Sequence, residues 1–275
     1  MRSQLALLLL IASTPLAAQQ QPLSFLRKSG AAEQDAALTI YKEQPYQPVR
    51  PGEVRQSAFL TESQALPFGK VLGPVSPTQV RSSSTASLAL TGTLIGIRPP
   101  AGATYAPGDT VVLAIVSQGP KGWGEIITPT GLARVGTSND RQTLATVITT
   151  YGPIRDGQVT LPIEPVKNPG RVQPVKASGP AGTIIGGAST RELEQPGGIM
   201  FSDLGRESGL RPGDFVEVRR RPAPRQNTSD TIDELMATGQ VLRVNARSST
   251  IKLLRVVAPG IAPGTPVVRV ATLPN

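Results

Sequence analysis

The residue types that perform most enzyme chemistry are missing from this sequence. It contains no His and no Cys. Their absence excludes a Ser-His-Asp triad, a Cys-His nucleophile, zinc sites built on imidazole or thiolate, and iron–sulfur ligation. Hydrolysis by paired carboxylates, Ser-Lys chemistry and metal sites with oxygen ligands stay open.

The acidic candidates are better explained by turns. Asp109 and Asp214 recur in matching Pro-Gly-Asp stretches, which favours a role in the turn over catalysis. Asp203 and Glu207 fit half of a carboxylate pair, or turn capping. No motif links Ser208 to Lys252 as nucleophile and base, although both types are present. We therefore predict no enzyme activity, no catalytic residue, no metal site and no cofactor.

The candidate binding residues are basic and aromatic. An arginine set lies around and after the second Pro-Gly-Asp stretch: Arg211, Arg219, Arg220, Arg221 and Arg225. Guanidinium groups pair well with phosphate or carboxylate, while a solvated loop explains the same residues. Trp123 lies in a glycine-flanked loop, where it either stacks on a sugar or partner, or closes the core of its module. The pairs Gly186-Gly187 and Gly197-Gly198 lack the helix and lysine of a phosphate cradle.

Two corners organise the chain. Pro107-Gly108-Asp109 precedes an apolar run, and Pro212-Gly213-Asp214 precedes Phe215 to Val218. Proline presets its own φ, glycine tolerates a positive φ, and aspartate bonds back to nearby amides. The residues that follow have the alternation of a strand with one buried face. The sequence thus predicts the same corner and strand twice.

Other markers recur in the same order, which indicates a tandem duplication. Gly92 to Gly96 and Gly182 to Gly186 are taken as the opening strands of the two copies, and Ile154 to Gly157 and Ile261 to Gly264 as their closing turns. The second copy then has an insert, 188–207, with an extra strand. The chain also holds 28 Gly and 27 Pro. We predict an all-β protein with two tandem small β-barrel or sandwich modules.

The first residues are typical of a cleaved secretory signal. Arg2 precedes an apolar run from Leu5 to Ala12, with cleavage expected after Ala18 and a retained anchor as the alternative. The predicted divisions are a signal peptide at 1–18, an extended or partly ordered region at 19–88, module 1 at 89–166, a linker at 167–180 and module 2 at 181–275. No later stretch is apolar and long enough to span a membrane.

The charge is basic. Cleavage removes one of 28 basic residues and leaves 27 against 19 acidic ones, a net charge of +8. Such a balance suits anionic surfaces such as lipid head groups, wall polymers or acidic partners, or serves solubility alone. We expect no binding to nucleic acid, because one Trp and few Tyr and Phe form no stacking platform.

Module 2 resembles a known family. Gly182 to Gly186, Ile199 to Asp203, Gly209 to Val218 and Gly239 to Val244 are similar to the SH3-like C-terminal domain of the flagellar assembly protein T family. They also resemble the region that follows LysM peptidoglycan-binding domains in exported bacterial proteins. The likeness covers 180–272 and, less closely, 90–165. It implies a Gram-negative protein, periplasmic or outer-membrane-associated, that binds other envelope components.

We therefore expect an exported structural or interaction protein of the cell envelope, whose partners are envelope proteins or wall polymers. A glycan- or peptidoglycan-binding protein of the LysM-associated type is the alternative, and a carboxylate-dependent hydrolase is a third. The sequence leaves the oligomeric state open.

Overall fold

The structure, a computed structural model, describes residues 49–75, 88–138, 143–166, 172–189, 194–220 and 233–274. The predicted signal peptide, Arg221 and Arg225 lie outside these residues. The described chain holds one α-helix, α2 (Pro51–Gln56), and is otherwise built of strands and turns. In this part of the chain, no helix is long and apolar enough to cross a membrane.

Six of the described strands form a first closed barrel, barrel 1. They are β2 (Gly69–Pro74), β3 (Leu94–Arg98), β4 (Thr110–Gln118), β5 (Glu125–Ser138), β6 (Thr143–Thr150) and β7 (Val159–Pro162). Their order around the barrel is β5-β4-β7-β2-β3-β6, and antiparallel pairing of β6 with β5 closes the ring. The short strand β1 (Phe59–Leu60) pairs with the start of β5, outside the ring.

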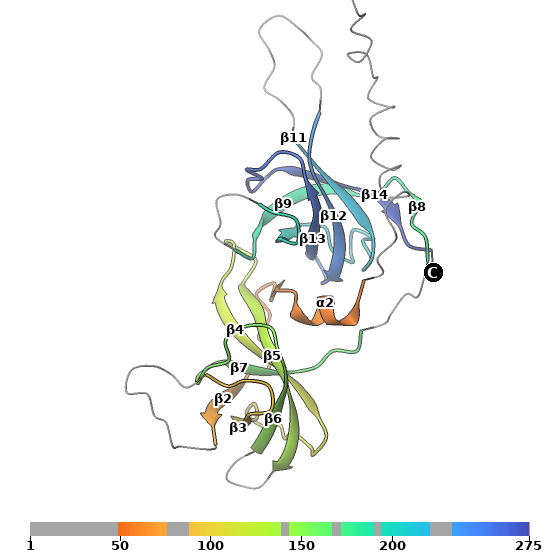
Figure 1. The fold of residues 1–275 in the computed structure, drawn as a ribbon. Helices are drawn as coiled ribbons and strands as arrows, with labels where there is room; N and C mark the ends of the chain where they lie inside the picture. The colour runs from red at the N-terminus through yellow and green to blue at the C-terminus, as the bar shows by residue number, and fades with distance from the viewer. Residues whose placement is uncertain are drawn as a thin grey trace, which may run out of the picture.

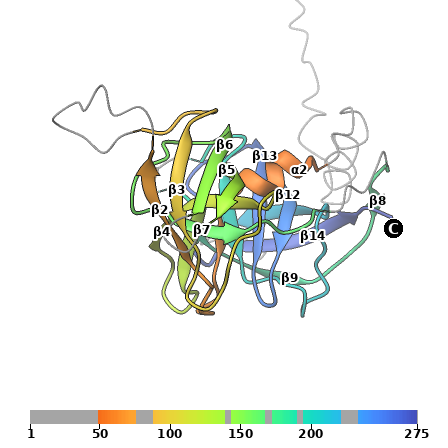
Figure 2. The same cartoon turned by 90° about the horizontal axis from the view of Figure 1, so that it is seen from below.

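Six further described strands form barrel 2. They are β9 (Ala181–Gly187), β10 (Ile199–Ser202), β11 (Phe215–Arg220), β12 (Glu234–Val244), β13 (Ser249–Val256) and β14 (Pro266–Thr272). Their order is β11-β12-β13-β10-β9-β14, and β14 pairs with β11 to close the ring. The strand β8 (Val175–Lys176) adds to β14. The two barrels lie one above the other in Figure 1, and Figure 2 views them from below.

The two rings have the same topology. Replacing β2 to β7 by β9 to β14 in order converts one ring into the other. A closed ring leaves no unpaired sheet edge, which explains why each short-stranded module is stable as a barrel. The prediction of two tandem small β modules is therefore confirmed.

The two Pro-Gly-Asp corners are equivalent in detail. Gly108 and Gly213 have φ values of +95° and +94°. The Gly108 N–H donates to the Val135 carbonyl at 2.8 Å, and the Gly213 N–H to the Val241 carbonyl at 2.7 Å. In each corner the aspartate accepts from the amide three residues earlier, at 2.8 Å in the first and 3.0 Å in the second. The corners thus occupy the same place in both barrels.

The predicted match between the opening strands is wrong. Val71 of β2, rather than Leu94, occupies the position in barrel 1 that Ile184 occupies in barrel 2. The Val71 N–H donates to the Gln158 carbonyl at 2.7 Å, and the Ile184 N–H donates to the Thr265 carbonyl at 2.8 Å. Gly69 to Gly73 is therefore the counterpart of Gly182 to Gly186, as both carry the same glycine spacing.

Gly92 corresponds instead to Gly197. Both have a φ of +86°. The Gly92 N–H donates to the Val147 carbonyl at 2.8 Å, and the Gly197 N–H to the Leu253 carbonyl at 2.7 Å, each just before its second strand. Consequently β10 is the counterpart of β3, and the interpretation of 188–207 as an insert with an extra strand was wrong.

The module boundaries also differ from the expected ones. Strand β2 belongs to barrel 1 although it precedes residue 89, and β8 lies inside the stretch expected to be a linker. Residues 49–75, expected to be extended or partly ordered, contain α2, β1 and β2. The helix and β1 belong to a segment, 49–66, that we call the clasp.

Each barrel has an apolar core of alternating inward side chains. In barrel 1 the fully buried side chains include Ile95, Ile97 and Leu113. In barrel 2 they include Ile251 and Leu253. Burying one such side chain contributes about 1.5–3 kcal/mol, so these cores are the main stabilising element of each ring.

Tyr105 makes the stability of barrel 1 depend on pH. Its ring is buried, and its hydroxyl shares a 2.9 Å hydrogen bond with the Thr160 hydroxyl. Burial raises the pKa of Tyr105 above its ordinary value of 10.0, and the hydrogen bond to Thr160 offsets part of this rise. Because the folded state holds the proton more tightly, its stabilising effect is complete below pH 10 and is lost as the pH rises through the folded-state value.

We therefore expect the free energy of unfolding to decline above pH 10, and to decline less steeply in Tyr105→Phe. At neutral pH this variant should be less stable by about 1 kcal/mol, since it lacks the hydrogen bond. Urea titrations at a series of alkaline pH values measure both effects. An unchanged alkaline slope in Tyr105→Phe would contradict the assignment.

The clasp fastens the barrels together through an apolar layer. The buried side chains of Ala58, Leu60, Ile126 and Phe201 form this layer. Trp123 packs against it from the β4–β5 hairpin, and Ile185, Ala188 and Ile199 pack against it from barrel 2. Helix α2 contacts β5 and β12, and Figure 1 shows it beneath barrel 2. We call this contact region the junction.

Polar bonds from the clasp to the β12–β13 turn complete the junction. A single oxygen of the buried Glu62 carboxylate, Oε1, accepts hydrogen bonds from the Arg247 N–H at 2.9 Å, the Ser248 N–H at 2.6 Å and the Ser248 hydroxyl at 2.7 Å. The Asn245 amide donates to the Leu60 carbonyl at 2.7 Å, and the Thr250 hydroxyl to the Ala58 carbonyl at 3.0 Å. The barrels are thus joined by specific hydrogen bonds as well as by apolar contact.

Candidate binding site at the mouth of the second barrel

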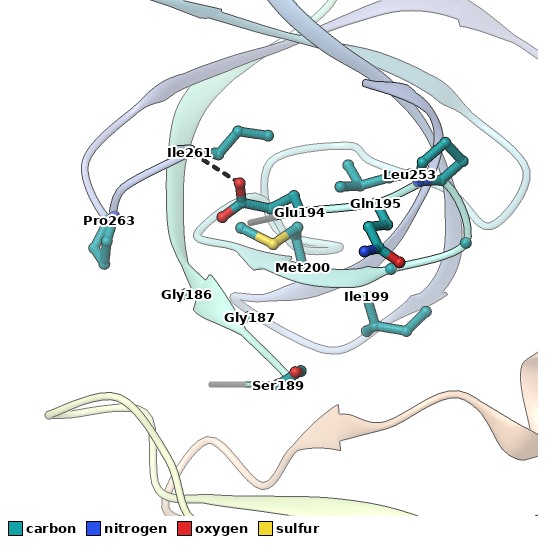
Figure 3. A pocket seen from close by; sticks show the side chains of 13 residues that line it. Gly186, Gly187, Ser189, Glu194, Gln195, Ile199, Met200, Leu253, Ile261 and Pro263 are labelled. Carbon is teal, nitrogen blue, oxygen red and sulfur yellow. Dashed lines mark hydrogen bonds between the residues drawn. The ribbon is translucent and has the colours of Figure 1, made fainter. Parts of the chain in front are cut away.

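A cavity of about 440 Å³ opens at one end of barrel 2. It lies where the β9–β10 and β13–β14 connections meet, and Figure 3 shows Glu194 and Met200 inside the ring of strands. The backbones of two glycine pairs, Gly186-Gly187 and Gly197-Gly198, form part of its wall. We call this cavity the mouth.

The floor of the mouth is the apolar core of barrel 2. Met200, Leu253 and Ile261 line it, and all three are buried. A Cβ atom at Gly187 would lie 3.3 Å from the Met200 sulfur. Glycine at this position therefore lets the chain pass close to the floor without filling the cavity.

The rim of the mouth is polar. It includes the Ser189, Glu194 and Gln195 side chains. Oε2 of Glu194 accepts hydrogen bonds from the Gly260 N–H at 2.8 Å and the Ile261 N–H at 3.2 Å, which hold the β13–β14 connection in place. Within the described residues no hydrogen bond reaches the other carboxylate oxygen, Oε1.

The equivalent end of barrel 1 is built differently. Ala89 precedes Leu94 by the same interval as Glu194 precedes Ile199, so the two positions correspond. In barrel 1 the Ala89 N–H donates to the Ile154 carbonyl at 3.1 Å, and the buried Ala89 packs into the core. A backbone bridge thus draws the chain over Ile154, whereas in barrel 2 a longer side chain spans the distance to Ile261 and leaves a cavity.

The mouth has the composition of a binding site. Concave sites with an apolar floor and a few convergent polar groups are the usual places for ligands. A ligand with an apolar face and hydrogen-bond donors or acceptors at its edge matches this lining. Within the described chain, no group of three or more Asp and Glu residues is arranged to hold a metal ion.

The structure separates the predicted arginine set. Arg211 lies in the corner before β11, while Arg220 ends that strand, and a strand of this length spans about 20 Å. Arg219 pairs with Glu217 at 2.7 Å, and Arg220 pairs with Glu234 at 2.7 Å. The guanidinium groups of Arg219 and Arg220 are therefore engaged within the β11–β12 hairpin.

Trp123 packs in the junction between the barrels. Its ring is half-buried against residues of barrel 2, and the Arg247 guanidinium lies 5.2 Å from the ring centroid. The Trp123 ring therefore does not close the core of its own barrel, and it does not stand free on the surface. The sequence did not suggest this third place for the ring, because the clasp and barrel 2 supply the contacts.

The acidic candidates have structural contacts. Asp203 accepts hydrogen bonds from the Thr183 N–H at 2.6 Å and its hydroxyl at 2.8 Å, so it joins the end of β10 to β9 rather than capping its own turn. Lys252 pairs with Glu53 of the clasp at 2.9 Å. Ser208 lies in the turn before the second corner, apart from that pair.

A smaller hollow of about 230 Å³ lies beside the clasp. The Arg243 guanidinium lies 4.1 Å from the centroid of the Phe59 ring and 3.3 Å from the Glu164 carboxylate. Burial lowers the pKa of Arg243, and the nearby Glu164 carboxylate offsets part of that shift. Because Glu164 is itself largely exposed, this ion pair acts mainly to position Arg243 over Phe59.

Sequence reasoning did not single out Ser189, Glu194 and Gln195 of the mouth. The signal was present in the two glycine pairs: Gly186, Gly187 and Gly198 allow close approach of neighbouring atoms, and Gly197 has a positive φ. Comparison with protein-family models and with curated proteins found no match.

Proposed function

We propose that this chain is an exported component of the bacterial cell envelope that binds another envelope component and carries out no chemistry itself. The signal-like N-terminal sequence and the resemblance of module 2 to envelope β modules support export. The absence of His and Cys and the structural roles of the acidic candidates support a binding function. Residues 1–18 act as the signal peptide, and the mature protein is periplasmic or outer-membrane-associated.

The observation that carries the proposal is the contrast between the two barrel ends. The two barrels share their Pro-Gly-Asp corners and the order of their strands. At one equivalent position, however, barrel 2 has Glu194 and barrel 1 has Ala89. Duplicated modules that keep the same framework and differ at one concave end are expected to differ in what that end binds. The mouth of barrel 2 is therefore the binding site of the proposed function.

A glycan of the cell wall is the second candidate ligand. The lining of the mouth favours it, since the carboxylate, amide and hydroxyl of Glu194, Gln195 and Ser189 can exchange hydrogen bonds with sugar hydroxyls above an apolar floor. Pull-down with purified peptidoglycan distinguishes this ligand from an envelope protein.

Filling the mouth should strongly weaken binding to the envelope component. Ser189→Trp places an indole at the rim, and we expect it to reduce co-sedimentation of the full chain with envelope fractions at least tenfold. Ser208→Trp is the matched control, because Ser208 is exposed in the connection at the opposite end of barrel 2. Equal binding by both variants and the unmodified chain would overturn the assignment of the mouth.

A further inference from the structure

The contact between the barrels identifies what an outer barrel face can bind. On barrel 2, outward residues of β9 and β10 lie under the β4–β5 hairpin of barrel 1. The Pro120 ring packs on the Gly186 backbone, and a Cβ atom at Gly186 would lie 3.3 Å from it. Trp123 packs against the same buried cluster as Ile185 and Ile199. In Figure 1 this hairpin reaches up to β9.

Barrel 1 has the equivalent face. The Val75 N–H donates to the Leu94 carbonyl at 2.9 Å, and the Ala188 N–H donates to the Ile199 carbonyl at 3.0 Å. These matching bonds fix the register of the two faces. The four equivalences that follow are Leu72 with Ile185, Val75 with Ala188, Leu94 with Ile199, and Gly96 with Phe201.

This face of barrel 1 is apolar and open. Leu72 is 41% exposed and Val75 is 40% exposed, although outward positions of a barrel are normally polar. Leu144 of β6 pairs with Gly96 and extends the surface. We call Leu72, Val75, Leu94, Gly96 and Leu144 the apolar face.

Gly96 has no side chain on this face and lies buried beneath its neighbours. The atoms nearest to a Cβ built at Gly96 belong to the Leu72 and Val75 side chains, each at 3.6 Å, and to the Gly73 carbonyl at 3.9 Å. In barrel 2 the corresponding Phe201 supplies a ring that packs with Trp123 in the junction. The apolar face lacks that ring, and an aromatic side chain from outside would pack on the exposed Leu72 and Val75 side chains that lie over Gly96.

We propose that the apolar face binds a β-hairpin of another protein that carries an aromatic residue at its tip. The occupant follows from the duplication: the equivalent face of barrel 2 already binds such a hairpin, Gly119 to Gly124, with Trp123 and Pro120 as its contacts. The chain's own aromatic-tipped hairpin is held in the junction by the clasp, so the occupant comes from a different protein.

The test uses the hairpin of this chain as the probe. A backbone-cyclised peptide of residues 118–125, which contains Trp123, is titrated into the isotope-labelled full chain and followed by NMR. We expect shifts at Leu72, Val75, Leu94 and Leu144. Leu72→Lys should weaken peptide binding about tenfold or more, because a charge replaces apolar contact at the centre of the surface. The same peptide with alanine in place of Trp123 should bind as weakly.

Three outcomes would overturn the proposal. They are shifts confined to Ile185, Ala188 and Ile199, unchanged affinity in Leu72→Lys, and no saturable shift at any residue of the apolar face. Sedimentation of the chain without peptide tests another occupant: self-association that Leu72→Lys abolishes would assign the face to a second copy. A matched control, Leu90→Lys, replaces an exposed leucine outside the apolar face and should leave the affinity unchanged. The mouth proposal is separate, since Ser189→Trp tests the other barrel.

Discussion

Replacing Glu62 with alanine should uncouple the two barrels and lower the free energy of unfolding by about 2–4 kcal/mol. The substitution removes the acceptor of three hydrogen bonds and leaves the buried Ser248 N–H and hydroxyl, and the part-buried Arg247 N–H, without it. An unpaired buried donor costs about 1–3 kcal/mol, so the two donors of Ser248 dominate the effect. Glu62→Gln keeps an oxygen acceptor and should cost less.

The chain's one tryptophan gives a direct measurement, since Trp123 lies in the junction. In urea titrations of Glu62→Ala, the fluorescence transition of Trp123 should precede the circular dichroism transition of the barrels. Glu207→Ala, which replaces an exposed glutamate in barrel 2, should leave the two transitions where they are in the unmodified chain. If the transitions of Glu62→Ala also coincide and keep their midpoint, Glu62 does not hold the junction.

The second large effect is expected at the corner of barrel 2. Asp214→Ala should lower the free energy of unfolding by about 3–5 kcal/mol, whereas Asp109→Ala should lower it by about 1 kcal/mol. Asp214 is buried, accepts from the Thr272 hydroxyl at 2.6 Å, and lies 3.5 Å from the Arg269 guanidinium. Asp109 is exposed and makes the single turn bond to Ala106 described above.

The two aspartates are each other's control, because their corners share backbone geometry. The larger loss comes from the part-buried Thr272 bond and from Arg269, which is partly buried and would remain beside an alanine, held by the carbonyls of Gly209 and Ser178. Thermal and urea unfolding of the two alanine variants measure the difference. Equal losses would mean that the turn bond alone stabilises both corners. Asp214→Asn should fall between the two.

The corners show what a sequence can predict about this fold. A proline, a glycine and an aspartate in a row determine a local conformation through φ and one side-chain bond, and both corners have the expected geometry. All-β architecture and the duplication followed from repetition of such local signals. Each of these local signals involves only residues that lie close together in the chain.

The opening strands show where that reasoning stops. Gly69, Gly92 and Gly182 each have a second glycine four residues on, and finding the true counterparts among these stretches depends on which strand pairs with the closing turn. That pairing joins Val71 to Gln158, far apart in the chain. Local pattern favoured Gly92 because its sequence is closer to that at Gly182, although its true counterpart is Gly197.

The candidate site was still less accessible to sequence reasoning. The mouth depends on a difference between two aligned positions, Ala89 and Glu194, and the alignment itself required the correct strand order. Trp123 was recognised as a notable residue, yet its place in the junction depends on Leu60 and Phe201, which belong to other elements. The mouth and the position of Trp123 both depend on contacts between segments that are far apart in the chain.

The position of the clasp in the chain has a consequence for biogenesis. Its hydrogen bonds to the β12–β13 turn and β13 join residues 185 to 192 positions apart. Because a chain is synthesised from its N-terminal end, Ala58, Leu60 and Glu62 are released long before their partners. Barrel 1 can close as soon as β7 is released, but fastening waits for residue 250. Until then the apolar residues of the clasp lack their partners, and during this interval the nascent protein is open to non-native contacts with other chains.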